Sequence, residues 1–417
     1  MSPLVQPIDD SGTLPAGRGA LHALNFFVAA MQTGFGPFVS VWLVSRGWSL
    51  TEVGLALSVG TIAALCAQLP GGLLVDAIHR KRDITAVALL LVAISALMIA
   101  VAPSVGSIWA AQILHAAGSV IISPAIAALT LSLCGHDSFS ERLGGNARYA
   151  SLGSALAAVL FGLTSTHLGE QSIFIITAAL ALPAAASLFA IRPGRGVPPP
   201  GDHMALVPPA ERDTPPWTVY RDPVMHIFAV CVILFQLSNA ALLPLLLGGL
   251  SHRGEAGGFV VPAAIMVPQL IAAVASPWAG AAARYMGRRK VLLAGFIALP
   301  VRALLFATDP GPEALEAMQI LDGISATVLG LMVPLIAADL TAKTGHLNLT
   351  IGSFGLAAGL GATVSTSIAG WAADRFGAEM TFLALAFAGA LAVLVLAVAM
   401  PETRPVAEAQ PAGIGSV

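Results

Sequence analysis

The stretch GGLLVDAIHRKR, residues 71–82, is the one around which the chain is organised. It follows an apolar run and ends in a cluster of basic residues. A related stretch, GAAARYMGRRK at residues 280–290, occupies the matching place in the second half of the chain. Pro70 and Pro277 precede the two copies at similar offsets. A short basic loop between two apolar helices, repeated in this way, predicts two related helical bundles.

The composition indicates a membrane protein. The chain has 417 residues, of which 57% are hydrophobic and only 10% charged, and its mean hydropathy is +0.85. Soluble domains carry about 25% charged residues. One membrane crossing needs roughly 20 apolar residues, so the length accommodates twelve spans with short loops. The net charge of −2 gives no indication of a nucleic-acid partner, and three scattered cysteines predict neither disulfides nor a metal site.

Apolar runs and turn residues place the spans and the domain boundaries. We expect spans at 21–44, 51–73, 84–102, 107–131, 147–166, 172–191, 222–249, 258–283, 291–307, 314–340, 349–372 and 380–400. The proline-rich stretch 192–221 predicts an extended linker rather than a domain. It separates a bundle at 21–191 from a bundle at 222–400, with tails at 1–20 and 401–417.

The Lys and Arg residues predict the orientation in the membrane, because cytoplasmic loops carry an excess of them. With the N-terminus inside, the cytoplasmic loops hold sixteen of the 20 basic residues, and the outer loops hold only Arg46, Arg253 and Arg375. The remaining residue, Arg302, lies inside a span. We therefore expect a multi-pass protein of the inner (plasma) membrane with both termini in the cytoplasm. No signal peptide is recognisable in residues 1–19.

Four residues of the first basic loop, Gly72, Asp76, Arg80 and Lys81, resemble the loop signature G-x-L-x-D-x-x-G-R-[RK] of the major facilitator superfamily. The resemblance implies an all-α fold of twelve transmembrane helices in two pseudo-symmetric six-helix bundles, with a site between them. It also ties the loop to conformational switching. Ile78 and His79 stand around the position of the second Gly in the signature. The expected switch residues of the second copy are Gly280, Arg284, Gly287, Arg288 and Arg289, with Arg284 in place of the acid.

Two shorter matches extend the repeat. The tetrapeptide QILH at 112–115 matches QILD at 319–322, an offset of 207. Residues Asn146, Ser151 and Gly153 match Asn348, Ser353 and Gly355 at an offset of 202. Both matches agree with parallel repeats related by an axis along the membrane normal.

Ionisable residues inside spans are costly and therefore indicate function. Asp322 is the first candidate for a proton-binding carboxylate. The alternative is a permanent ion pair with Arg302 of the preceding span, and Arg302 could itself hold a carboxylate or phosphate substrate. His115 stands at the matching position of the first half. Imidazole suits a proton relay, although a neutral histidine bonded between helices is equally compatible with the sequence.

Uncharged polar residues on the spans predict a solute path. Asn25 and Gln32 are seven residues apart in the first span, and Gln236 and Asn239 are three apart in the seventh, so each pair shares a helix face. The family resemblance implies that spans one, four, seven and ten line a central cavity. The substrate-cavity candidates are Asn25, Gln32, Gln112, Gln236, Asn239, Gln319 and Arg302. The alternative is that the amides hydrogen-bond between packed helices.

Two acidic residues near span ends have separate explanations. Ser49 and Glu52 have the spacing of a helix capping box. We expect Asp76, with Arg80 nearby, to lock the bundles in one state through contact with the start of a helix.

The function that follows is secondary active transport of a small organic solute by alternating access, with proton-coupled efflux of an amphipathic compound as the first hypothesis. The alternatives are uptake of a sugar or organic acid, and a non-transporting receptor or assembly factor with the same fold. No phosphate loop or hydrolase motif is present, so we expect neither an enzyme nor a cofactor. The expected partners are the lipid bilayer, a small-molecule substrate and protons as candidate coupling ions, for a monomer.

Overall fold

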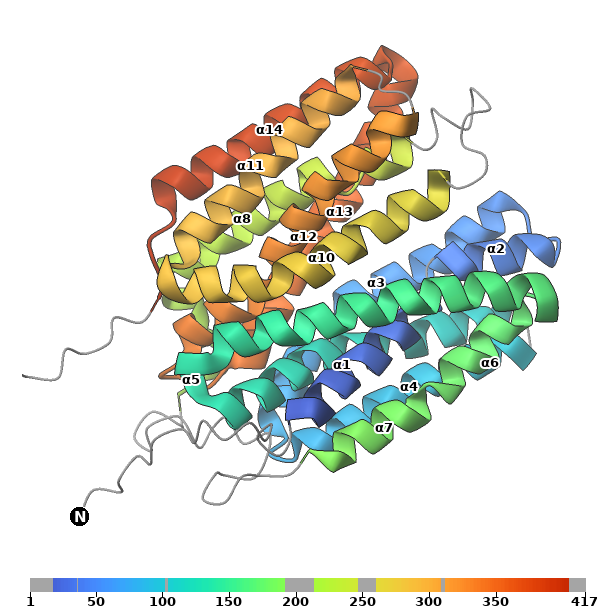
Figure 1. Cartoon of the computed structure of the whole chain (residues 1–417), viewed down its shortest axis with the longest axis horizontal. Helices are drawn as coiled ribbons and strands as arrows, with labels where there is room; N and C mark the ends of the chain where they lie inside the picture. The colour runs from blue at the N-terminus through green and yellow to red at the C-terminus, as the bar shows by residue number, and fades with distance from the viewer. Residues whose placement is uncertain are drawn as a thin grey trace, which may run out of the picture.

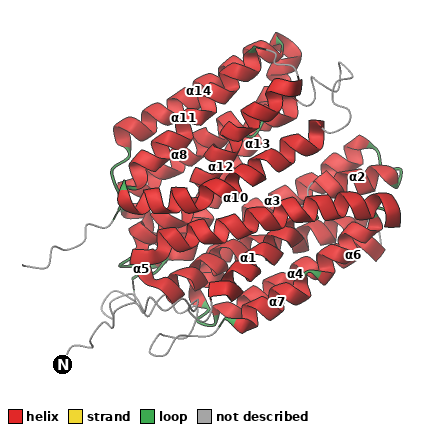
Figure 2. Cartoon of the chain, in the orientation of Figure 1, coloured by secondary structure: helices red, strands yellow, loops and turns green. Residues whose placement is uncertain are grey.

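The computed structural model describes residues 18–35, 37–101, 104–191, 214–246, 260–308 and 312–404. All regular elements in these ranges are helices (Figure 2). In the first half they are α1 (Arg18–Thr33), α2 (Pro37–Ser45), α3 (Leu50–Ala77), α4 (Lys81–Val101), α5 (Val105–Leu168), α6 (Gln171–Ala179) and α7 (Ala181–Ala190). In the second half they are η3 (Pro216–Arg221), α8 (Pro223–Asn239), α10 (Val260–Tyr285), α11 (Arg288–Ala307), α12 (Pro312–Thr341), α13 (Leu347–Phe376) and α14 (Ala378–Ala399).

These helices correspond to the twelve expected spans. Ten helical stretches within the described ranges are long and apolar enough to cross a membrane. One of them, α5, is 64 residues long and contains two spans, joined at Gly135 with a φ of 66°. The remaining span is the first, which consists of α1 and α2 with a break after Thr33. The sixth span also consists of two helices, α6 and α7, which meet at Leu180.

The helices form two groups, shown in blue to green and in yellow-green to red in Figure 1. In the first group, α5 packs against α1, α3 and α4; in the second, α8 packs against α13 and α14, and α11 packs against α12 and α14. Each group has a large apolar core, and the core of the second group also includes residues of α5 such as Phe139. Most of the expected linker and of both expected tails lies outside the described residues, at 1–17, 192–213 and 405–417.

Local signals in the sequence explain several helix starts. Ser49 caps α3: its Oγ accepts a hydrogen bond from the Glu52 amide at 3.3 Å, and Glu52 accepts one from the Ser49 amide at 2.8 Å. The expected capping box is therefore confirmed. Asp222 caps α8 with a single hydrogen bond, accepting from the Val224 amide at 2.8 Å, and Pro223 stands at the first helical position.

Candidate functional site

Two helix pairs make the most extensive contacts between the bundles, and in each pair glycines allow the backbones to touch. In the first pair, α3 with α13, a Cβ placed on Gly72 would clash with the carbonyl oxygen of Asn348, and one on Gly352 would clash with that of Gln68. In the second pair, α10 with α5, a Cβ on Gly280 would lie 2.5 Å from the carbonyl oxygen of Ser140. A Cβ on Gly144 would lie 2.5 Å from that of Ser276. We call these contacts the α3–α13 seam and the α5–α10 seam.

The two seams are related by an offset of 208 residues. Adding 208 to the numbers of Gly72 and Gly144 gives Gly280 and Gly352, and adding it to those of Gln68 and Ser140 gives Ser276 and Asn348. Contacts inside the bundles repeat as well. Gly153 packs on the carbonyl oxygen of Phe26, and Gly361 packs on that of Ile233, at offsets of 208 and 207. The expected offset of 207 for spans four and ten agrees with this repeat. The offset of 202 for spans five and eleven is wrong, since a match of three small or polar residues is too short to fix a helical register.

Asp76 closes the α3–α13 seam by capping α13. Its Oδ1 accepts hydrogen bonds from the backbone amide of Asn348 at 3.0 Å and from its Nδ2 at 2.7 Å, and Oδ2 accepts one from the Leu349 amide at 2.9 Å. The helix begins after His346, whose side chain makes no capping hydrogen bond. A carboxylate from the other bundle therefore satisfies free amides at a helix N-terminus and interacts favourably with its dipole.

Arg284 occupies the position of Asp76 in the α5–α10 seam and carries the opposite charge. Its guanidinium donates a hydrogen bond at 2.8 Å to Oε1 of Glu141 on α5. Both side chains are about two-fifths exposed. The sequence offered Arg284 as a departure from the acidic position; the structure shows that its partner is an acid on the facing helix.

The expected role of Arg80 does not hold in the structure. Its side chain is 86% exposed and lies 3.8 Å from Asp83, so it is not placed to assist Asp76. The buried residue is Lys81, whose ammonium group donates to carbonyl oxygens at the end of α3, including that of Ile78 at 2.6 Å. A cation at this position offsets the negative end of the helix dipole. Lys81 therefore anchors the loop, and Arg80 is solvated.

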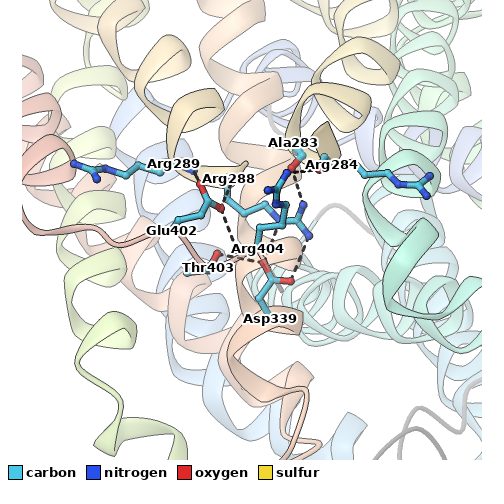
Figure 3. A network of polar contacts seen from close by, with 8 residues as sticks. All are labelled: Ala283, Arg284, Arg288, Arg289, Asp339, Glu402, Thr403 and Arg404. Carbon is cyan, nitrogen blue, oxygen red and sulfur yellow. Dashed lines mark hydrogen bonds and ion pairs between the residues drawn. The ribbon is translucent and has the colours of Figure 1, made fainter. Parts of the chain in front are cut away.

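The second basic loop is held by a larger network (Figure 3). Arg288 donates to both carboxylate oxygens of Asp339 on α12, at 3.0 and 3.3 Å, and to the carbonyl oxygen of Ala283 at 2.7 Å. The side chains of Arg288 and Asp339 are both nearly buried. Lys81 bonds the carbonyl oxygen of Val75 in the first half, which matches the bond from Arg288 to Ala283.

Glu402, beyond the last span, completes this network. Its Oε1 accepts from the Arg288 amide at 2.7 Å, and its Oε2 accepts from the Arg289 amide at 3.2 Å. Thr403 donates to Asp339 at 3.2 Å, and Arg404 donates to the carbonyl oxygen of Tyr285 at 2.8 Å. A Cβ on Gly287 would clash with Glu402. Residues 402–404 are therefore part of the fold, whereas the sequence placed them in a tail.

A cavity of about 770 Å³ lies between the bundles. Four of the expected cavity residues, Asn25 and Gln32 of α1 and Gln236 and Asn239 of α8, line it. Further polar lining residues are Gln68, Ser119, Ser123 and Asn146. The cavity volume is in the range of small-molecule sites, which are typically about 300–1,000 Å³.

His115 stands directly behind the cavity wall. Its Nε2 lies 2.9 Å from Oε1 of Gln32 and 3.1 Å from Oγ of Ser119. Its ring stacks on Phe35 with a centroid distance of 3.7 Å. Ser119 also donates to Gln32 at 3.1 Å. Gln32 and Ser119 thus connect the imidazole to the cavity.

Asp322 forms an ion pair with Arg302, the arrangement that the sequence left open as an alternative to a proton site. The Arg302 guanidinium bonds Oδ1 of Asp322, and its side chain is 2% exposed against 17% for Asp322. Neither residue is among those that line the cavity. Two other candidates are also placed elsewhere: Gln112 packs next to Gly60 of α3, and Gln319 is fully buried.

Several participants were not identified from the sequence. Glu141 lies beyond the kink of α5 and Glu402 lies in a supposed tail, where acidic residues are ordinary, and only the fold shows that Asp339 pairs with Arg288. Asn146 was noted for a repeat match, and it lines the cavity. The sequence did contain one signal for Glu141. Arg284 stands where the first loop has an acid, and a cation at that position calls for an acidic partner on the facing helix. Among the described residues, no group of His, Cys, Asp and Glu could hold a metal ion.

The structure has two equivalent seams with residues of opposite charge, a cavity between the repeated bundles, and basic loops at one end. These features define a membrane carrier of two pseudo-symmetric halves. Residues 21–275 and 228–415 match the Major Facilitator Superfamily, and the chain belongs to this family. Two uncharacterised MFS-type transporters from strains of Mycobacterium tuberculosis are each 32% identical over 409 residues, covering 94% of this chain and 96% of theirs.

Solved structures share the fold. A variant of the E. coli fucose:proton symporter FucP superposes with a TM-score of 0.73 at 16% identity, covering 91% of this chain and 97% of that one. FucP in the outward conformation gives a TM-score of 0.69 at 15% identity, with the same shares of the two chains covered. The human organic anion transporter MFSD10 gives 0.66 at 15% identity, covering 92% of this chain and all of that one. At these sequence identities, the solved structures show that the fold is shared, and they do not indicate the substrate of this chain.

Proposed function

We propose that the protein is a secondary active transporter that carries a small organic solute through the central cavity by alternating access. The observation that carries this proposal is the pair of equivalent seams. Both lie at the end of the basic loops, where α1 begins and where the described C-terminal residues also lie (Figure 1). Separating the seams would open the cavity toward that end, and closing them directs access to the opposite end. The FucP structure in the outward conformation is of the same fold, which supports this assignment.

The orientation belongs to the same proposal. Because the basic residues gather at the seam end, we place that end and both termini in the cytoplasm of a cell whose inner (plasma) membrane holds the protein as a monomer. Cysteines introduced at Arg80 and Glu379, exposed residues at opposite ends, test the orientation. An impermeant thiol reagent added to intact cells should label Glu379→Cys and spare Arg80→Cys. Labelling of Arg80→Cys from outside would reverse the orientation.

We further propose that transport is coupled to protons and that His115 is the coupling site. The basis is that both hydrogen-bond partners of His115 line the cavity, so that a bound solute and the imidazole contact the same amide and hydroxyl. A histidine can take up and release a proton with modest changes of its surroundings. Asp322, the other candidate, is neutralised by Arg302, which favours a structural role for that pair.

Transport in reconstituted vesicles with and without a pH gradient tests both assignments. His115→Gln should abolish pH-driven accumulation and leave solute exchange at equal pH measurable. Asp322→Asn alone leaves Arg302 unpaired and should destabilise the protein by about 3–5 kcal/mol. The double variant Asp322→Asn with Arg302→Gln should restore both stability and pH-driven transport. A stable double variant that exchanges solute but has lost pH-driven accumulation would assign coupling to Asp322.

The same vesicles separate the remaining alternatives. Accumulation driven by protons leaving the vesicle marks antiport, as in efflux, and accumulation driven by protons entering with the solute marks uptake. A solute that binds the purified protein but crosses under neither gradient nor exchange conditions would indicate a receptor or assembly factor with this fold.

A further inference from the structure

The cavity wall contains no charged side chain among the described residues that form it. Its polar groups are amides and hydroxyls, and the charged pair of Arg302 and Asp322 lies outside the wall. An ion that enters such a cavity loses part of its hydration and finds no counter-charge in the wall itself. Neutral hydrogen bonds do not offset that loss of solvation, whereas an uncharged solute loses much less on entry. The wall therefore disfavours organic anions and cations alike.

The polar groups are distributed unequally between the two bundles. Six come from the first bundle and two from the second: Asn25, Gln32, Gln68, Ser119, Ser123 and Asn146 on one side, Gln236 and Asn239 on the other. The second bundle contributes both aromatic rings, Phe235 and Phe354. Helix α12 contributes only apolar side chains, a glycine and a proline, among them Leu329 and Val333. One wall is thus rich in hydrogen-bonding groups, and the other is largely apolar.

Two amides of the cavity wall, Asn146 and Asn239, have a buried oxygen that lacks a hydrogen-bond partner. Asn146 is 3% exposed, and its Nδ2 donates to Oγ1 of Thr130 at 2.9 Å, which fixes the side chain while its Oδ1 stays unpaired. Oδ1 of Asn239, on the opposite bundle, is also buried and unpaired. Both oxygens have almost no accessible surface, so they do not face a solute in the cavity. The hydrogen bonds open to a solute are those of the other polar lining groups.

We infer that the cavity binds an uncharged amphipathic organic solute with hydrogen-bonding groups, whose polar face lies on the first bundle and whose apolar face lies on the second. This inference rests on the proposed function, because it takes the cavity as the solute site. Among the solutes considered above, the inference favours neutral amphipathic compounds and sugars, and it excludes small organic acids.

Ligands matched in shape that differ in charge test the inference. Phenyl β-glucoside is neutral and has an apolar ring on a hydroxylated one. Phenyl β-glucuronide has a carboxylate in place of the hydroxymethyl group, and phenyl β-glucosaminide has an ammonium group in place of one hydroxyl. Corresponding trios with larger aromatic groups extend the range of size. The unfolding temperature of the purified protein is measured across ligand concentrations, because a ligand stabilises the state that binds it. In at least one trio the neutral member should bind ten-fold or more tightly than either charged member. Equal or tighter binding of a charged member, or no binding of any neutral member, would overturn the inference.

Two variants locate the binding in the cavity. Asn239→Leu should weaken the neutral ligand at least ten-fold, whereas Gln171→Leu, remote from the cavity wall, should leave it unchanged. Asn239→Asp should shift the preference within the trio toward the glucosaminide, because it places a carboxylate in the wall. If Asn239→Leu leaves binding unaltered, the ligand lies elsewhere and the inference fails. Binding with this selectivity but without movement across vesicles would leave the inference standing and remove the proposed transport.

Discussion

The α3–α13 seam and the α5–α10 seam share a backbone geometry and differ in chemistry. Each brings a glycine of one bundle against a carbonyl oxygen of the other, at positions 208 residues apart. Beyond the glycines, Asp76 bonds backbone amides in one seam, and Arg284 bonds a side chain in the other. Both copies of the repeat thus have the close contact between helix backbones, whereas the polar contact beside the glycines differs between the two seams.

The difference follows from where the facing helices begin. Helix α13 begins at Leu347, so the amides of Asn348 and Leu349 lie in its first turn and have no partner within the helix. An acid opposite them can accept both hydrogen bonds. On α5 the helical stretch resumes after Gly135, so Glu141 lies beyond the first turn, where amides are already bonded. Only a side chain can then serve as partner, and a cation facing Glu141 meets that need.

The largest effect is expected when the shared feature is broken. Gly72→Ala or Gly280→Ala places a methyl group against a backbone carbonyl and should prevent its seam from closing. The population should shift to the state open at the basic loops by ten-fold or more. The readout is the labelling rate of Ser123→Cys from that side, in a chain without the three native cysteines. Gly153→Ala, whose clash lies within one bundle, should instead lower the unfolding temperature, and Gly162→Ala, which has open space, should do neither. Slow labelling in Gly72→Ala would contradict the seam.

A smaller effect is expected for Asp76→Asn. The carboxamide retains one acceptor and loses the charge at the α13 N-terminus, a change worth about 1–2 kcal/mol. Transport should slow. The affinity for solute should remain within about two-fold, because Asp76 does not line the cavity. This expectation assumes that hydrogen bonds at the seam affect only the switch between the two states. Equilibrium binding measured beside transport separates the two. Equal loss of both would mean that Asp76 is required for folding.

The polar contact of the α5–α10 seam should matter less. Arg284 and Glu141 are partly exposed, and such pairs contribute about 0–1 kcal/mol. Arg284→Gln should therefore accelerate labelling of Ser123→Cys by less than about five-fold, and 0.5 M salt should reduce even this difference. An effect as large as that of Asp76→Asn would show that the two seams are energetically equal.

The smallest effect is expected for Arg80→Ala, because its solvated side chain contributes to neither seam. Transport and the unfolding temperature should stay at the level of the unaltered protein. Lys81→Met is the matched comparison, since it removes a buried cation from the end of α3, and it should lower the unfolding temperature by several degrees. If Arg80→Ala and Lys81→Met behaved alike, the loop would depend on its net charge rather than on the buried contact.

The sequence predicted the twelve spans, the two repeated bundles and the family, because apolar runs and basic loops are local signals. Helical spacing put four amides in pairs on two helix faces, and the family resemblance implied that these faces line a cavity, which the four residues do. The sequence could not predict that Asp76 would reach α13 or that Arg284 would reach Glu141, since these contacts join residues far apart in the chain. The placement of Arg80 failed for a similar reason. Adjacent basic residues look alike in a sequence, and only the direction of the helix end distinguishes the buried Lys81 from its neighbour.

The docking of Glu402 has a consequence for how the protein is made. The amides of Arg288 and Arg289 begin α11, and the carboxylate that caps them lies more than a hundred residues later in the chain. During synthesis α11 must enter the membrane before its cap exists, with water at the membrane surface satisfying the amides in the meantime. Residues 402–404 then fasten the second bundle after every span has been inserted. A chain that ended at Met400 would contain all twelve spans and leave the amides at the start of α11 without this carboxylate.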